Sequence, residues 1–249
     1  MSGASFPQGF LWGSATSSHQ VEGGNDRNDW WDWEQQPGRI RDGTTSGDAA
    51  GWWAGRAEED LARAAEMGQN AHRLSVEWSR LEPEPGTWSD EAFKRYAVML
   101  GACRDHGLTT MVTLNHFTLP RWAAEQGSWM NPELPDRLAR LGAECARRLG
   151  SLVDLWCTIN EPNVVGVAAY GTDVFPPGLN RNTAAFKVMR RQIEAHALTY
   201  RAVHEVIPDS RVGLVLNMPW FTPHRPGHPL DRFAAWAQDW AFSEVFVRA

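Results

Sequence analysis

The sequence predicts an α/β fold and, within that class, a parallel β/α barrel. Segments with the composition of strands alternate along the chain with segments that have the period of amphipathic helices. Polar side chains follow several of the strands, at the ends where a parallel barrel carries its functional residues. A doubly wound sheet is the alternative, but no glycine-rich phosphate turn follows the first strand. The chain has 249 residues, and we expect residues 1–249 to form a single domain.

Five strands are expected. Residues 10–16 are apolar at first and then small and polar, so a short strand runs out to a polar rim at Gln20. Residues 71–78 alternate between polar and apolar side chains, with Arg73 on the polar face. The lumen of a barrel can provide hydrogen-bond partners for such a polar face. The remaining strands are expected over residues 109–115, 152–159 and 211–217.

Helices are expected between the strands, wherever apolar residues recur at helical spacing. Ser89 is a typical N-cap, because carboxylates follow it in the first turn. Residues 21–48 have no sustained period, so they are expected to form a long loop, and such loops usually carry function. The predicted apolar faces include Phe186 and Tyr200 in the fourth helix and Phe233 and Trp240 in the fifth. The helices are expected over residues 53–68, 90–107, 136–149, 183–203 and 230–241.

The composition excludes several classes of function. A net charge of −6 and a pI near 5.8, without a Lys/Arg cluster, argue against a nucleic-acid partner. No basic segment precedes an apolar one at the start, and no apolar run is as long as a membrane span, so we expect neither export nor a membrane partner. The three cysteines lack metal-site and disulfide spacing and are expected to be reduced core residues of a cytoplasmic protein.

Residues 158–162, Thr-Ile-Asn-Glu-Pro, hold the strongest candidate for chemistry. The fourth strand is expected to end there, because Pro162 cannot donate to a ladder and biases Glu161 towards an extended conformation. Glu161 should therefore be presented at the edge of the sheet. From these residues alone, a charged side chain that closes a strand in solvent is the favoured interpretation, because charged residues are mostly exposed.

Four motifs together resemble glycoside hydrolase family 1, the β-glucosidase family: residues 10–16, 72–80, 115–120 and 158–162. They occur in the family's order and span essentially the whole chain. The resemblance implies a (β/α)8 TIM barrel with only about the first five β/α units in this chain, so that the domain would be C-terminally incomplete. It also implies hydrolysis of terminal β-linked sugars of oligosaccharides or glycosides, with retention of anomeric configuration. We expect no cofactor and no metal.

The resemblance also implies site residues. Glu161 would be the general acid/base, and Asn160 would hold the 2-hydroxyl of the sugar. Gln20 and His116 would bind hydroxyls on the far side of the ring, and Arg73 would lie beneath the sugar beside the nucleophile. Retaining hydrolysis needs two carboxyl groups about 5 Å apart, one protonated and one ionised. In this context the catalytic interpretation of Glu161 becomes the favoured one.

The sequence departs from the family pattern in two places. Phe117 follows the histidine where many members have Trp, and the loss of an N–H donor affects the preference between gluco- and galacto-configured substrates. Nothing after Pro162 matches the family's Thr-Glu-Asn-Gly-like motif, which carries the nucleophile. The remaining candidates lie in helical patterns, where a solvated face is the ordinary interpretation: Glu194, Glu205 and Glu244.

Two hypotheses stay open. In the first, the chain is the N-terminal part of a β-glycosidase and is inactive without its other half or a complementing chain. In the second, it is a sugar-binding or assembly module that does not hydrolyse. The expected partners are a small-molecule β-glycoside and either a second copy or a C-terminal half. A metal hydrolase is a weak third idea, because Glu161 already has a role; its candidate ligands would be His19, His116, His224 and His228.

Overall fold

The computed structural model describes residues 5–248 and contains a five-stranded parallel sheet. Each strand pairs in parallel with the next one along the chain. Parallel neighbours joined by helical crossovers are the repeating unit of a β/α barrel, so the five predicted units are present. The strands are β1 (Gly13–Ala15), β2 (Ala71–Ser75), β3 (Thr109–Asn115), β4 (Leu155–Asn160) and β5 (Arg211–Val215).

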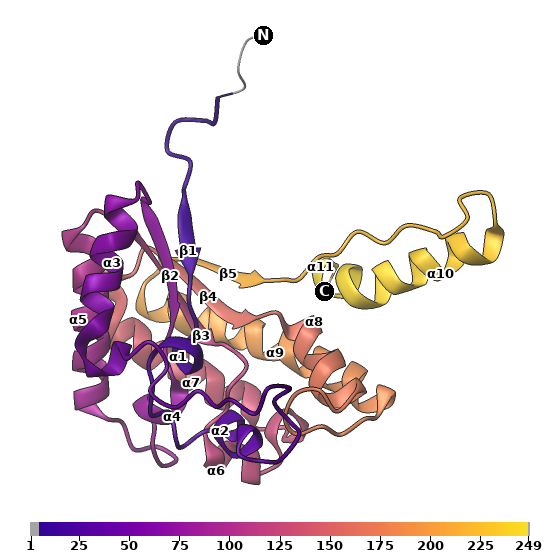
Figure 1. The fold of residues 1–249 in the computed structure, drawn as a ribbon, viewed down its shortest axis with the longest axis horizontal. Helices are drawn as coiled ribbons and strands as arrows, with labels where there is room; N and C mark the ends of the chain where they lie inside the picture. The colour runs from indigo at the N-terminus through magenta and orange to yellow at the C-terminus, as the bar shows by residue number, and fades with distance from the viewer. Residues whose placement is uncertain (1–4, 249) are drawn as a thin grey trace.

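Four long helices connect successive strands and lie beside the sheet (Figure 1). They are α3 (Ala57–Glu66), α5 (Asp90–Asp105), α7 (Leu134–Leu149) and α9 (Asn182–Val206). Short helices gather at the end of the sheet opposite the start of β1: α1 (Ser18–Val21), α2 (Asp29–Glu34), α4 (Trp78–Leu81) and α6 (Arg121–Glu125). Further helices are α8 (Pro162–Val165), α10 (Pro229–Asp239) and α11 (Val245–Val247), and short π- or 3₁₀-helical segments are η1 (Trp52–Arg56), η2 (Ser128–Met130), η3 (Gly150–Leu152), η4 (Gly166–Gly171) and η5 (Trp240–Glu244).

Alternation along the strands separates apolar from polar side chains. On β3, Val112 and Leu114 belong to the hydrophobic core, whereas Thr113 and Asn115 are buried polar residues. Successive side chains of a strand point to opposite faces, so the helices cover the apolar face and the other face is polar. The polar face is the one that a barrel encloses.

The N-terminal region differs from the sequence prediction. β1 has only three residues, and Gln20 lies in the one-turn helix α1 rather than at the end of a strand. The expected long loop contains α2, which Asn28 caps by accepting the Trp31 N–H at 2.8 Å. These short helices depend on local turns and caps, which leave no 3.6-residue period for a sequence pattern to detect.

The buried faces of α9 and of the C-terminal helices also differ from the sequence prediction. Phe186 and Tyr200 of α9 are exposed, whereas small residues of that helix face α7. The reason is close packing at Gly142 of α7, where a Cβ atom would lie 2.6 Å from Thr199 Cγ2. On the C-terminal helices, Phe233 and Trp240 are exposed, and α10 lies apart from the other long helices (Figure 1).

The close contact between α7 and α9 can be tested with a matched pair of glycine substitutions. Gly142→Ala should lower the free energy of unfolding by about 1–3 kcal/mol, because the stiff Thr199 side chain has to move. Gly101→Ala in α5 should raise it by about 0.4–1 kcal/mol, because nothing lies within 4 Å of the added Cβ and alanine stabilises a helix. Urea unfolding followed by circular dichroism measures both. Stabilisation by both variants would contradict the close approach.

Candidate active site

β4 ends in a bulge directly before Glu161. Cys157 pairs with Gly213 and Asn160 with Val215, so β4 has one residue more than β5 between these pairs. Bulges bend a strand and re-aim its side chains, and they recur beside active sites. The irregularity therefore sets the direction in which the end of β4 presents its polar side chains.

Glu161 has a left-handed backbone, with φ 46° and ψ 58°, which corrects the extended conformation expected before proline. The chain turns here from β4 into α8. The Glu161 N–H donates to the Val215 carbonyl at 2.8 Å, and the Glu161 carbonyl accepts from the Val165 N–H at 3.1 Å. These bonds hold a conformation that costs about 1–3 kcal/mol for a residue other than glycine. The side chain is half-buried, and Asn217 Nδ2 lies 3.5 Å from Oε1.

Arg73 reaches from β2 across β3 to β4. Its Nη1 donates to Asn160 Oδ1 at 2.8 Å, and Asn160 is buried. Because Oδ1 is the acceptor in this bond, the Asn160 amide N–H2 is the group left to donate to a ligand. Within the residues that the structure describes, the Arg73 guanidinium has no carboxylate partner.

His116 follows β3 and is half-buried. Burial, together with the positive charge of Arg73, lowers the pKa of His116 to about 4, so the imidazole is neutral near pH 7. Its Nδ1 is buried and has no hydrogen-bond partner among residues 5–248. The next residue, Phe117, has a φ of 73°, and the Thr118 N–H donates across it to the His116 carbonyl at 2.9 Å. Such backbone strain is concentrated at functional sites.

Gln20 is exposed, and its placement depends on its neighbour His19, which is buried. Asn28 Oδ1 accepts the Trp31 N–H, so Asn28 Nδ2 is the group 3.2 Å from His19 Nδ1. His19 Nδ1 is then an acceptor, and Nε2–H donates to Glu34 Oε2 at 3.4 Å. These contacts anchor α1, which carries Gln20 at the same end of the sheet as His116.

Three aromatic side chains from three different segments of the chain meet beside His116. Trp30 stacks on Phe117, with ring centroids 6.3 Å apart and planes at 23°, and it meets Phe175 edge-on at 4.7 Å. The Phe117 and Phe175 centroids are 5.5 Å apart, and the His116 ring lies 5.0 Å from Phe117. All three aromatic residues are half-buried. We call Trp30, Phe117 and Phe175 the aromatic cluster.

A buried ion pair ties the segment after β1 to the segment after β2. Glu22, which is 2% exposed, accepts hydrogen bonds from Arg80 Nε at 3.0 Å and Tyr96 Oη at 2.6 Å. Burial raises the pKa of Glu22 to about 7, although the Arg80 charge acts in the opposite direction. Arg80 also donates to the Gly23 carbonyl at 2.6 Å and stacks on Trp53. The pair therefore fixes the chain just beyond α1.

Other candidate groups lie away from these strand ends. Glu194 and Glu205 are on α9 and Glu244 is in η5, so all three are helical, as the sequence predicts. No group of three or more His, Cys, Asp or Glu that could hold a metal occurs among the described residues. Within the same residues, every helix is too short or too polar to cross a membrane. The three cysteines are free and buried: Cys103, Cys145 and Cys157.

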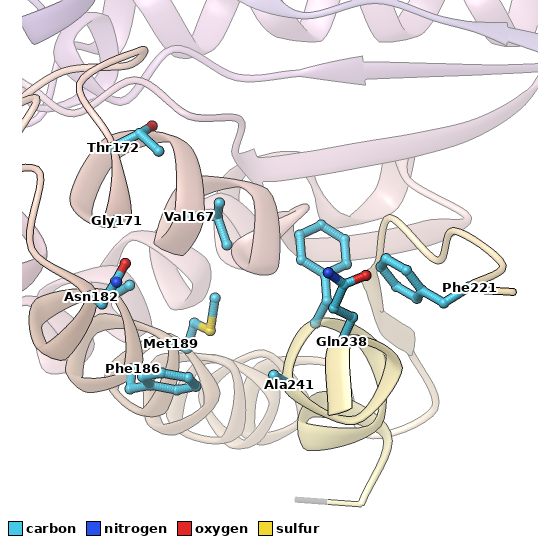
Figure 2. A pocket seen from close by; sticks show the side chains of 11 residues that line it. Val167, Gly171, Thr172, Asn182, Phe186, Met189, Phe221, Gln238 and Ala241 are labelled. Atoms are coloured by element: carbon cyan, nitrogen blue, oxygen red, sulfur yellow. The ribbon is translucent and has the colours of Figure 1, made fainter. Parts of the chain in front are cut away.

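A separate apolar cavity of about 420 Å³ lies between α9, η4 and the C-terminal helices. Figure 2 shows Phe186 and Met189 of α9 at this cavity, with Phe221 and Gln238 on its other side. No Asp, Glu or His lines it, so it offers no group for acid/base catalysis. The strand ends remain the candidate active site.

Comparison with known proteins decides the family. The family described as glycosyl hydrolase family 1 matches residues 2–248. The chain belongs to glycosyl hydrolase family 1. It is 32% identical to beta-glucosidase A of Thermotoga maritima over 88% of this chain and 50% of that protein. It is 31% identical to the cytosolic beta-glucosidase of Homo sapiens over 92% of this chain and 51% of that protein. The chain thus spans about half the length of the family 1 relatives that it matches.

Solved structures of similar proteins have the same fold. The AHE enzyme from Alicyclobacillus herbarius superposes with a TM-score of 0.94 at 29% identity, over 98% of this chain and 56% of that one. The family 1 β-glucosidase from Thermotoga maritima gives a TM-score of 0.92 at 29% identity, over 95% of this chain and 54% of that one. The predicted barrel fold, with five of its β/α units in this chain, is confirmed.

Sequence reasoning missed several residues of this family 1 site. Trp30 lies in α2, and its only signal was the tryptophan-rich stretch around it, whereas Phe175 lies in a loop after η4 that gave no signal. Asn217 follows β5 as a polar residue at the end of a strand, a signal that could have identified it. The sequence does not identify Glu22 as buried, because it cannot distinguish a buried glutamate in a loop from an exposed one.

The buried pair generates a prediction for stability. Arg80→Met should lower the free energy of unfolding by about 3–5 kcal/mol near pH 8, because it leaves Glu22 buried without its cation. Because burial raises the pKa of Glu22 in the folded state, protonated Glu22 stabilises the folded protein. This contribution to the free energy of unfolding is full below pH 4.5 and is lost as the pH rises through about 7. The loss on substitution should therefore be smaller at pH 5 than at pH 8.

Urea titrations at the two pH values measure this difference. Arg63→Met is the matched control, because Arg63 pairs with Asp60 on the surface of α3 and should contribute less than about 1 kcal/mol. Equal, small losses for the two variants at both pH values would show that Arg80 is not holding a buried charge.

Proposed function

We propose that the protein containing this chain is a retaining β-glycosidase in which Glu161 is the general acid/base. The observation that carries the proposal is the hydrogen bond from Arg73 to Asn160, which orients the amide directly before Glu161. An amide with a free N–H2 group can donate to the 2-hydroxyl of a sugar, and this bond strengthens in the oxocarbenium-like transition state. His116 and Gln20 lie at the same end of the sheet and would bind other hydroxyls.

Each residue would have a separate part in the reaction. Glu161 donates a proton to the leaving glycosidic oxygen and then takes one from water as the glycosyl-enzyme intermediate is hydrolysed. Arg73 supplies the positive charge that keeps a nearby carboxylate ionised, as a nucleophile requires. His116, neutral near pH 7, can both donate and accept hydrogen bonds with hydroxyls. The substrate class is a small-molecule β-glycoside.

A second candidate function applies to residues 1–249 alone. Among the described residues no carboxylate pairs with Arg73, the charge expected beside a nucleophile, whereas Gln20, His116 and Asn160 would bind sugar hydroxyls. Binding of β-glycosides without hydrolysis is the function that such a set supports. The nucleophile would then come from a further segment of the protein or from a complementing chain.

In a catalytically active protein containing these residues, Glu161→Gln should slow substrates with poor leaving groups by at least about 100-fold and activated aryl glycosides much less. Protonation matters most when the departing oxygen is basic. Azide should partly restore turnover of the activated substrates by replacing the water that Glu161 activates. Steady-state kinetics on an alkyl and a nitrophenyl β-glucoside give both ratios. Glu205→Gln on the surface of α9 is the control, and equal losses on both substrates would make Glu161 structural.

Residues 1–249 by themselves should not hydrolyse an activated aryl β-glucoside above the rate in buffer. A retaining reaction needs the carboxylate that forms the covalent intermediate, and positioned acid catalysis alone does not replace it. The assay uses purified residues 1–249 with and without a co-expressed C-terminal half of a family 1 enzyme. Turnover by the isolated chain that Glu161→Ala abolishes would falsify this prediction, because it would require a nucleophile within these residues.

A further inference from the structure

We infer that Glu77 is a positioning residue for sugar binding: it fixes Gln20 and His116 relative to each other, so that one sugar can contact both. The inference rests on the proposed function, because it takes Gln20 and His116 as residues that bind sugar hydroxyls. Glu77 is fully buried, so it acts on a ligand only through its neighbours.

One oxygen atom of Glu77 joins the two segments that carry the hydroxyl-binding residues. Glu77 Oε2 accepts from Ser18 Oγ at 3.1 Å and from Thr118 Oγ1 at 3.0 Å. Ser18 lies two residues before Gln20, and Thr118 lies two residues after His116. Because both hydroxyls converge on a single atom, the segment after β1 and the segment after β3 are held to each other through Glu77.

Glu77 is itself held by further hydrogen bonds. Its other oxygen, Oε1, accepts from Ser79 Oγ at 2.8 Å and from the Ser79 N–H at 3.4 Å. The Glu77 N–H donates to Tyr96 Oη at 2.7 Å, and Tyr96 is a fully buried residue of α5. The carboxylate cannot turn towards one segment without losing these bonds, so Oε2 is a fixed point for both segments.

The contacts at Ser18 and Thr118 reach the hydroxyl-binding residues through short pieces of hydrogen-bonded chain. Ser18 is the first residue of the one-turn helix α1, which contains Gln20. The Thr118 N–H donates to the His116 carbonyl at 2.9 Å, and the Thr118 carbonyl accepts from Asn115 Nδ2 at 2.9 Å. A displacement of either hydroxyl from Glu77 would therefore move the hydroxyl-binding residue beside it.

A role in packing alone does not call for a carboxylate at this position. No ion pair formed by the described residues includes Glu77, and burying a carboxylate without a cation lowers the free energy of unfolding. An apolar side chain would fill the space without this cost. It could not hold two hydroxyls, because that requires an acceptor. The contacts to Ser18 and Thr118 are thus what the carboxylate supplies.

The test is binding of methyl β-D-glucoside to residues 1–249, measured by ligand-observed NMR. Thr118→Val keeps the shape of the side chain and removes its hydrogen bond to Glu77, so it should weaken binding about three- to tenfold. In a chain that already carries His116→Ala, the same substitution should have less than about a twofold effect, because the positioning acts through His116. Thermal unfolding establishes that each variant is folded.

The matched control is Thr199→Val in α9. Thr199 is also a fully buried threonine, and its hydroxyl has no hydrogen-bond partner among residues 5–248, so binding should keep the wild-type affinity. Glu77→Gln keeps an oxygen that can accept from both hydroxyls and should retain most of the affinity, whereas Glu77→Ala should lose at least as much as Thr118→Val.

The segment after β1 provides a second, independent cycle. Ser18→Ala should weaken binding in the wild-type chain by a similar factor, and it should have less than about a twofold effect beside Gln20→Ala. This cycle decides the matter if Thr118→Val does not fold.

Three outcomes would overturn the inference. They are wild-type affinity in the folded Thr118→Val and Ser18→Ala variants, equal weakening with and without the hydroxyl-binding residue, which would make Glu77 purely structural, and no binding of the glucoside by the folded wild-type chain. None of these readouts requires turnover. Failure of the proposed hydrolase function, which the Glu161 kinetics measure, is therefore distinguishable from failure of the positioning role.

Discussion

The hydrogen bond from Arg73 to Asn160 is the interaction on which the candidate site depends. It joins β2 to β4 over the intervening strand, so it forms only when β2, β3 and β4 are in register. A guanidinium on the polar face of a sheet needs such a partner, because an unpaired buried charge is costly. Burial lowers the pKa of His116, and the positive charge of Arg73 acts in the same direction. One cation thus orients an amide on one neighbouring strand end and, together with burial, favours the neutral imidazole on another.

Buried carboxylates connect the loops at the same end of the sheet. Glu77 Oε2 accepts from Ser18 Oγ at 3.1 Å and from Thr118 Oγ1 at 3.0 Å, so one side chain after β2 joins the segments after β1 and β3. Glu22 and Arg80 make a second such connection. Hydrogen bonds to ionised groups are stronger than those between neutral groups, and truncating one partner leaves the other unsatisfied. Buried polar contacts therefore connect the segments after β1, β2 and β3 at this end of the sheet.

The order and type of the long elements could be predicted from the sequence, because each has a period and a boundary signal of its own. The strand expected over residues 109–115 coincides with β3, and Ser89 caps α5 through the Ala92 N–H as expected. The placement of Gln20 could not be predicted, because α1 has a single turn and is anchored by side chains distant in sequence. The site residues themselves follow from motifs, but their contacts depend on strand register, which no local pattern specifies.

Two residues with a left-handed backbone explain why the expected extended conformation before Pro162 is not found at the candidate site. A residue before proline prefers an extended backbone, yet Glu161 is left-handed, and Phe117 is left-handed one strand away. Each is held by hydrogen bonds across the turn, which offset a cost of about 1–3 kcal/mol. An extended Glu161 would continue the direction of β4, whereas the left-handed turn starts α8 directly after it. The left-handed turn is thus what allows β4 to end on a half-buried carboxylate beside Asn160. The preference of a residue before proline for an extended backbone reflects only neighbouring residues, so it does not include the tertiary hydrogen bonds that hold Glu161 in this turn.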